Sequence, residues 1–232
     1  MLQACFILLT IALAIVLYIL AAKVSLAAIP DPHKQRRFIK RTALVLIGWL
    51  VYVTAISMTG IFTEPTLPPR IPLLLVAPTF LFFIYFFTVA RFKGIIAGIP
   101  QAWPVYFQSF RVVVELLIWG AFMHGILPQS ATFEGHNFDI LIGLTAPLVA
   151  YFTFTKPRLP KSIFVLWNFA GLITLAIVVF ILIRHAYFIP VPNPATNILS
   201  KGFGSFPYTF LAGLYMPIAV FMHILSLIKT RE

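Results

Sequence analysis

The stretch ACFILLTIALAIVLYILAA, residues Ala4–Ala22, contains no charged side chain. An α-helix rises 1.5 Å per residue, so about 20 apolar residues match the ~30 Å hydrocarbon core of a bilayer. The stretch also lacks the alternation of apolar and polar residues that is typical of a membrane β-barrel strand. Because backbone polar groups in lipid must be paired internally, the sequence predicts a membrane-spanning helix here.

This first apolar stretch differs from a secretory signal peptide in two ways. No basic residue precedes it, and it is longer than the 7–15 residues of a signal peptide's apolar core. We therefore expect it to be retained as the first span of the protein.

The rest of the chain has the same character. Of its 232 residues, 61% are hydrophobic and only 10% are charged, and the mean hydropathy is +0.99. A soluble domain carries about 25% charged residues. The composition therefore predicts an all-α, polytopic integral membrane protein, with a lipid bilayer as its surroundings.

Further apolar runs follow the first one, and together they predict one transmembrane domain over residues 1–232, a bundle of seven helices. The predicted spans are 4–24, 42–62, 71–90, 103–124, 138–154, 162–184 and 207–228. We expect Gly120, Gly143, Gly171 and Gly213 to lie at helix contacts, because small residues let membrane helices approach closely. The fourth and fifth spans should be neighbours, since their connection is short.

Basic residues lie mostly in alternate loops of this arrangement. One side receives thirteen of them: Lys23, Lys34, Arg36, Arg37, Lys40, Arg41, Arg91, Lys93, Lys156, Arg158, Lys161, Lys229 and Arg231. The other side receives Arg70, Arg184 and Lys201. Since basic loops remain cytoplasmic, we predict an outer N-terminus and a cytoplasmic C-terminus. The same placement explains the net charge of +11 without nucleic acid, which we exclude as a partner. The short loops are typical of a bacterial inner-membrane protein.

The fourth span contains a polar face. Gln108, Arg111 and Glu115 are spaced i, i+3 and i+7, which places them on one side of a helix. Arg before Glu is the weaker order for an ion pair within one helix, so partners on other helices are expected. Two alternatives remain open: the residues tie helices together, or the apolar core starts at Val112 and Arg111 extends to the inner interface.

A second polar cluster, ATFEGHNFD (residues 131–139), separates the fourth and fifth spans. It holds two of the chain's six acidic residues, and we expect Glu134, His136, Asn137 and Asp139 to lie at the outer surface. Asn137 or Asp139 can cap the fifth helix by accepting hydrogen bonds from its first N–H groups. The positive end of the helix dipole also favours Asp139.

Three of the five histidines, His124, His136 and His185, are expected on this same outer side. With nearby carboxylates they could bind a transition metal or a haem. The spacing typical of metal sites is absent, so no cofactor is predicted. In the last span, Pro217 is expected to kink the helix. Tyr208, Tyr215 and His223 are expected to serve interior packing and as an interfacial anchor, and a proton-coupled element is the alternative.

Several seven-helix functions can be excluded. Residues 207–228 contain no lysine that could carry retinal, and the signature motifs of G-protein-coupled receptors and of ceramidase-like zinc hydrolases are missing. The sequence predicts instead a transporter, channel or sensor for a small solute or ion. Its path would run from Glu134, His136, Asn137 and Asp139 to Gln108, Arg111 and Glu115. A structural or accessory subunit, and an intramembrane metalloprotein or enzyme, remain alternatives, and the oligomeric state and any partner subunit stay open.

Overall fold

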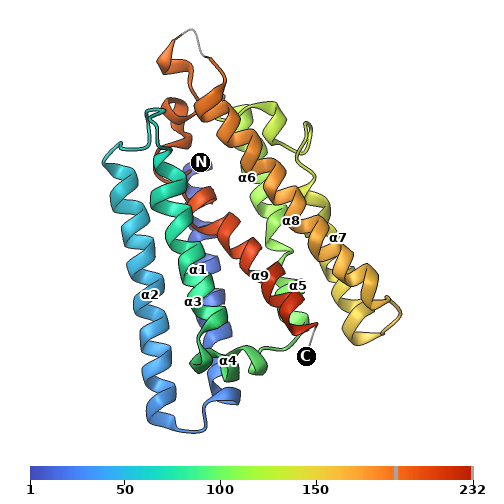
Figure 1. Ribbon diagram of the computed structural model, residues 1–232. Coiled ribbons are helices and arrows are strands. Elements are labelled where there is room, and N and C mark those ends of the chain that lie inside the picture. The colour runs from blue at the N-terminus through green and yellow to red at the C-terminus, as the bar shows by residue number, and fades with distance from the viewer. Residues whose placement is uncertain (191–192, 231–232) are drawn as a thin grey trace.

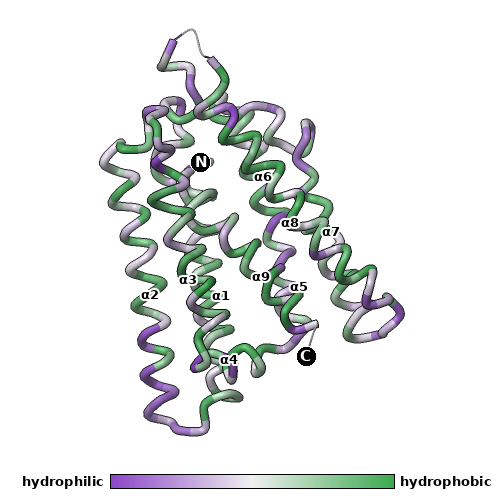
Figure 2. The backbone as a smooth tube through the Cα atoms, viewed as in Figure 1, coloured by the Kyte–Doolittle hydropathy of each residue, from purple (hydrophilic) through white to green (hydrophobic). Residues whose placement is uncertain are grey.

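The computed structural model describes residues 1–190 and 193–230, and this part of the chain is helical with no strand (Figure 1). The prediction of an all-α protein is therefore confirmed. Helices satisfy their backbone hydrogen bonds internally, which is what such apolar runs require in lipid. Figure 2 shows hydrophobic residues along most of each long helix.

The first two helices, α1 (Leu2–Ala28) and α2 (Pro32–Met58), form a long hairpin. Helix α2 begins ten residues before the second predicted span, 42–62. Asp31 accepts hydrogen bonds from the backbone N–H of His33 (2.8 Å) and Lys34 (3.3 Å), and Pro32 occupies the first helical position. The basic residues that follow therefore lie on an extension of α2, seen as the hydrophilic end of that helix in Figure 2.

The next segment bends sharply. A π-helical turn, η1 (Pro72–Val76), leads into α3 (Ala77–Thr88), and then η2 (Ala90–Phe92) and α4 (Lys93–Gly98) turn away by 75°. The buried Lys229 donates hydrogen bonds to the carbonyls of Ile96 (2.9 Å) and Ala97 (3.2 Å) at the end of α4. Cations suit helix C-termini, so this contact fastens α4 to the last helix.

The middle of the chain supplies the next pair of helices. Helices α5 (Ala102–Phe107) and α6 (Phe110–Met123) are separated by a short break at Gln108 and Ser109. After η3 (Gln129–Ala131), α7 (Asp139–Ala150) continues into η4 (Tyr151–Thr155). As expected for the fourth and fifth spans, α6 packs against α7.

The last helices close the bundle. Helix α8 (Lys161–Ile183) continues into η5 (Arg184–Phe188), and the short turns η6 (Pro194–Thr196) and η7 (Leu199–Phe203) follow. Then η8 (Leu211–Tyr215) leads into α9 (Met216–Lys229). Helix α9 packs against α3, α5 and α8 and is the most enclosed of the long helices, as Figure 1 shows.

Glycines lie at the closest helix contacts. A side chain at Gly120 would meet Leu2, one at Gly143 would meet Val112, and one at Gly213 would meet Val53. At Gly171, an added Cβ would overlap the imidazole ring of His223. All four glycines predicted at helix contacts are therefore confirmed there.

Within the described residues, five helices are long and apolar enough to cross a membrane: Leu2–Ala28, Pro32–Met58, Ala102–Met123, Lys161–Phe188 and Leu211–Lys229. The bent pair Pro72–Thr88 and Ala90–Gly98 makes six if it counts as one span. The helix Asp139–Thr155 is apolar but has only 17 residues. Exposed apolar side chains such as Leu8, Leu44, Leu81 and Phe180 suit contact with lipid tails. The architecture is consistent with a multi-pass membrane protein.

Candidate functional site

Arg111, on α6, lies at the meeting point of four helices. Its Nη2 group pairs with the carboxylate of Asp139 on α7 and also donates to the Thr174 hydroxyl (3.1 Å) and the Gly171 carbonyl (3.3 Å) on α8. Arg111 is 2% exposed and Asp139 is 4% exposed. Arg111 is therefore buried inside the bundle and does not extend to the inner interface. As the sequence predicted, its ion-pair partner comes from another helix.

The other end of the guanidinium group contacts α9. Arg111 Nη1 lies 2.9 Å from Nε2 of His223, and an arginine can only donate, so Nε2 accepts. The proton of this imidazole is therefore on Nδ1, which donates to the amide oxygen of Asn168 (3.0 Å). Asn168 in turn donates to the Phe164 carbonyl (2.9 Å). Because only one ring nitrogen carries a proton, His223 is neutral in this arrangement.

Glu115 has a different partner. Its Oε2 accepts a hydrogen bond of 2.6 Å from the amide of Asn137, which also donates to the carbonyl of Ala131 (2.9 Å). The amide oxygen of Asn137 accepts from the backbone N–H of Asp139 (2.9 Å), the first residue of α7. Asn137 therefore accepts from the first N–H of α7, as predicted, and links the carboxylate of Glu115 to the start of the helix that carries Asp139.

The four polar residues between α6 and α7 separate into two groups. Glu134 and His136 are exposed, and Glu134 accepts a hydrogen bond from the indole of Trp119 (2.9 Å). Asn137 (1% exposed) and Asp139 are buried, so the expectation that all four lie at the surface is wrong for these two. The buried Gln108 donates to the carbonyl of Ala219 on α9 (3.0 Å) and is not hydrogen-bonded to the acids.

The chain before α7 enters the bundle deeply. Arg111 lies roughly 13 Å along the helix axis from Ala102 and roughly 18 Å from Met123, at 1.5 Å per residue. Asp139, which pairs with it, is already the first residue of α7. Irregular backbone is tolerated at membrane depth only where protein or a water-filled cavity surrounds it. The buried residues Ala131, Thr132 and Asn137 meet that condition, and they explain why Asp139–Thr155 is short.

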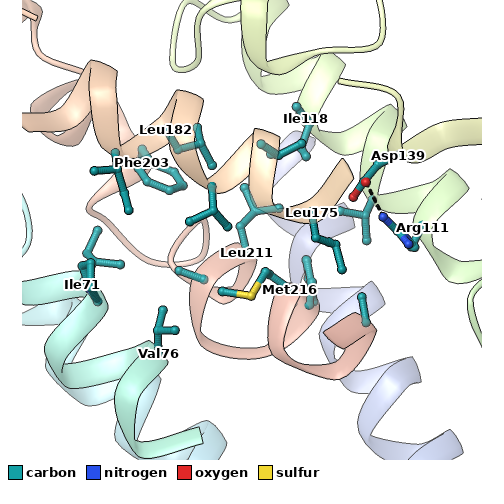
Figure 3. Close-up of a pocket in the computed structure, with 18 of the residues that line it drawn as sticks. Ile71, Val76, Arg111, Ile118, Asp139, Leu175, Leu182, Phe203, Leu211 and Met216 are labelled. Atoms are coloured by element: carbon teal, nitrogen blue, oxygen red, sulfur yellow. Dashed lines mark hydrogen bonds and ion pairs between the residues drawn. The ribbon is translucent and has the colours of Figure 1, made fainter. Parts of the chain in front are cut away.

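A cavity of about 90 Å³ borders this cluster. Arg111, Glu115 and Asp139 are the charged members of its described lining, while η1, α8, η8 and α9 provide mainly apolar walls. Figure 3 shows the Arg111–Asp139 pair at one end, with Ile71, Val76 and Phe203 toward the other. A cavity of this size has room for more than one water molecule.

We call Arg111, Glu115, Asn137, Asp139, Asn168 and His223 the buried polar network. The sequence indicated the first four of these residues and missed the functional connection of the last two. Asn168 is a single amide within the apolar run of α8, and His223 was assigned to packing or, alternatively, to a proton-coupled element of the last span, without a link to Arg111. The sequence feature that could have identified them is that each is a polar residue within an apolar span. An unpaired polar group there is unfavourable, so each needs a hydrogen-bond partner.

The histidines considered for a metal do not gather. His124 contacts the carbonyl of Gly120 (2.8 Å), His185 contacts that of Ile181 (2.8 Å), and His136 is exposed. Among residues 1–190 and 193–230, no group of three or more His, Cys, Asp or Glu side chains could hold a metal ion.

The chain matches no protein-family model, no curated protein and no solved structure.

Proposed function

We propose that this protein is a transporter, channel or sensor for a small solute or ion, and that the solute binds at the buried polar network. The observation that carries this proposal is the cavity inside the bundle that is bordered by Arg111, Glu115 and Asp139. Charged side chains in a membrane interior are unfavourable by a few kcal/mol and generally mark substrate or ion pathways.

The size of the cavity limits the solute. Pockets for drug-sized ligands usually have volumes of ~300–1,000 Å³. A cavity of about 90 Å³ suits water, an ion or a comparably small solute. The exposed residues Glu134 and His136, near the outer end of α6, complete the path on the outer side.

The orientation belongs to the same proposal. With Pro72–Thr88 and Asp139–Thr155 counted as spans, the chain crosses the membrane seven times, with its N-terminus outside and its C-terminus in the cytoplasm of a bacterial cell. The distribution of basic residues supports this arrangement. Arg231, one of the basic residues counted on the inner side, lies outside the described residues.

Cysteine labelling tests the orientation. Cys5 is the only native cysteine, so a Cys5→Ser background can carry single cysteines at Gln35, beside the basic start of α2, or at His136. In intact cells, a membrane-impermeant maleimide should label the cysteine at position 136 and leave the one at position 35 unlabelled until the membrane is opened. The reverse pattern would contradict the proposed orientation.

Flux measurements test the solute path. Purified protein in liposomes should conduct protons, Na⁺ or K⁺ above the level of empty liposomes, as followed with pH-sensitive and ion-sensitive dyes. Glu115→Gln should abolish the flux, because the variant keeps the shape of the side chain and loses its charge. Glu64→Gln, an exposed residue away from the network, is the matched control and should retain the flux.

A structural or accessory subunit is the second candidate function. It is favoured by the network itself, because Arg111, Asp139, His223 and Asn168 satisfy most of their hydrogen bonds with one another. Under this function, Glu115→Gln would lower thermal stability without changing any flux. The comparison of flux and stability in the same variant therefore separates the two functions.

A further inference from the structure

The buried polar network contains one more negative group than positive groups. Arg111 carries one positive charge, and the carboxylates of Asp139 and Glu115 carry up to two negative charges. His223 adds none, because its Nε2 accepts from Arg111 and its Nδ1 donates to Asn168. With both carboxylates ionised, the network has a net charge of −1.

No other charged group in the described surroundings balances this excess. Arg111 and Asp139 face Glu115 from α6 and α7, and Asn137 contacts it from the preceding loop. Thr174 on α8 contacts Arg111, and His223 on α9 lies behind the guanidinium group.

Two tyrosines also line the cavity, Tyr187 from η5 and Tyr215 from η8. The Tyr215 hydroxyl is engaged elsewhere, with the Phe6 carbonyl (2.6 Å) and the Thr10 hydroxyl (2.8 Å). Neither tyrosine supplies a positive charge.

The geometry selects which species can restore neutrality. An unpaired buried charge is unfavourable by several kcal/mol, so the site requires one positive charge. Metal cations, Na⁺ and K⁺ included, need several oxygen ligands in place of their hydration shell, and Mg²⁺ or Ca²⁺ require about six or more. The mainly apolar walls do not provide them. An anionic solute would increase the excess. A proton needs only one carboxylate oxygen.

We propose that the Glu115–Asp139 pair binds one exchangeable proton and that Glu115 is its main acceptor. Asp139 is held in a direct ion pair with Arg111, whereas Glu115 accepts from the neutral amide of Asn137. The cavity beside both carboxylates has room for water molecules, which can carry the proton. The Nε of Arg111, whose side chain also lines the cavity, is buried and has no hydrogen-bond partner among the described residues, so it is a donor that a water molecule could use. This inference rests on the proposed function of the same site, because it names the proton as the solute.

Infrared spectroscopy of the protein in lipid membranes tests the proposal without a transport assay. At neutral pH, the wild type should show the carbonyl band of a protonated carboxylic acid, and the band should shift in D₂O because the proton is exchangeable. Glu115→Gln should lose this band, and Glu64→Gln should keep it. A missing band in the wild type, or a band that persists in Glu115→Gln, would overturn the proposal.

Two further results keep the test independent of folding and of transport. If Glu115→Gln does not fold, Glu115→Asp should retain a protonated-acid band at a displaced frequency, and an unchanged band would assign the proton to another group. If the infrared band depends on Glu115 but the liposomes show no flux, the proton site stands and the transport function is refuted. If the liposomes show flux but the infrared band is missing, the proposed function stands and the proton site is refuted.

Discussion

Arg111→Met is expected to lower the free energy of unfolding by about 3–5 kcal/mol, the usual loss when one partner of a buried ion pair is removed. The substitution leaves Asp139 and Glu115 buried without a cation. It also removes the donors to His223, Thr174 and Gly171, so α6 loses its polar contacts with α8 and α9. Thermal or chemical unfolding in mild detergent measures the change.

The control for Arg111→Met is Arg158→Met, which changes the same side chain at an exposed loop position. Its effect should stay within about 0.5 kcal/mol. The double variant Arg111→Met/Asp139→Asn removes both charges of the pair, so it should be less destabilised than the sum of the two single variants. Losses that add without coupling would show that Arg111 and Asp139 do not stabilise one another.

The sequence predicts the helices of this protein better than their ends. Apolar runs identify each long helix, because lipid leaves few alternatives for the backbone. Helix α2 begins ten residues before the predicted span, which starts at residue 42, and the basic segment between them was interpreted as a loop. The cap at Asp31 extends the helix through that segment, and such an extension outside the apolar core leaves no hydropathy signal.

The candidate site was predictable in part. The order of Arg111 and Glu115 indicated partners outside their own helix, and the partners are Asp139 on α7 and Asn137 in the loop before it. The depth of those partners was not predictable, because a polar segment between two spans is normally assigned to the surface. It depends instead on tertiary burial of the loop before α7, which no local pattern encodes.

The contact between α8 and α9 explains the second large effect. Gly171 faces the imidazole of His223, and any Cβ at this position would overlap the ring. The ring cannot move away without breaking its hydrogen bonds to Arg111 or Asn168. The absence of a side chain at Gly171 is therefore a condition for the whole buried polar network.

Gly171→Ala is accordingly expected to lower the free energy of unfolding by about 1–3 kcal/mol, the range for overpacking a filled interior, even though Ala is the better helix former by about 1 kcal/mol. Gly48→Ala is the matched control, because that glycine also lies within a helix and nothing is within 4 Å of its added Cβ. It should be neutral or slightly stabilising in the same detergent unfolding assay. His223→Ala removes the ring that the added Cβ of Gly171→Ala would overlap. His223→Ala should therefore lower the free energy of unfolding less in the Gly171→Ala protein than in the wild type. Equal stability of Gly171→Ala and Gly48→Ala would mean that α8 and α9 can separate freely, and that the His223 ring does not fix the position of Arg111.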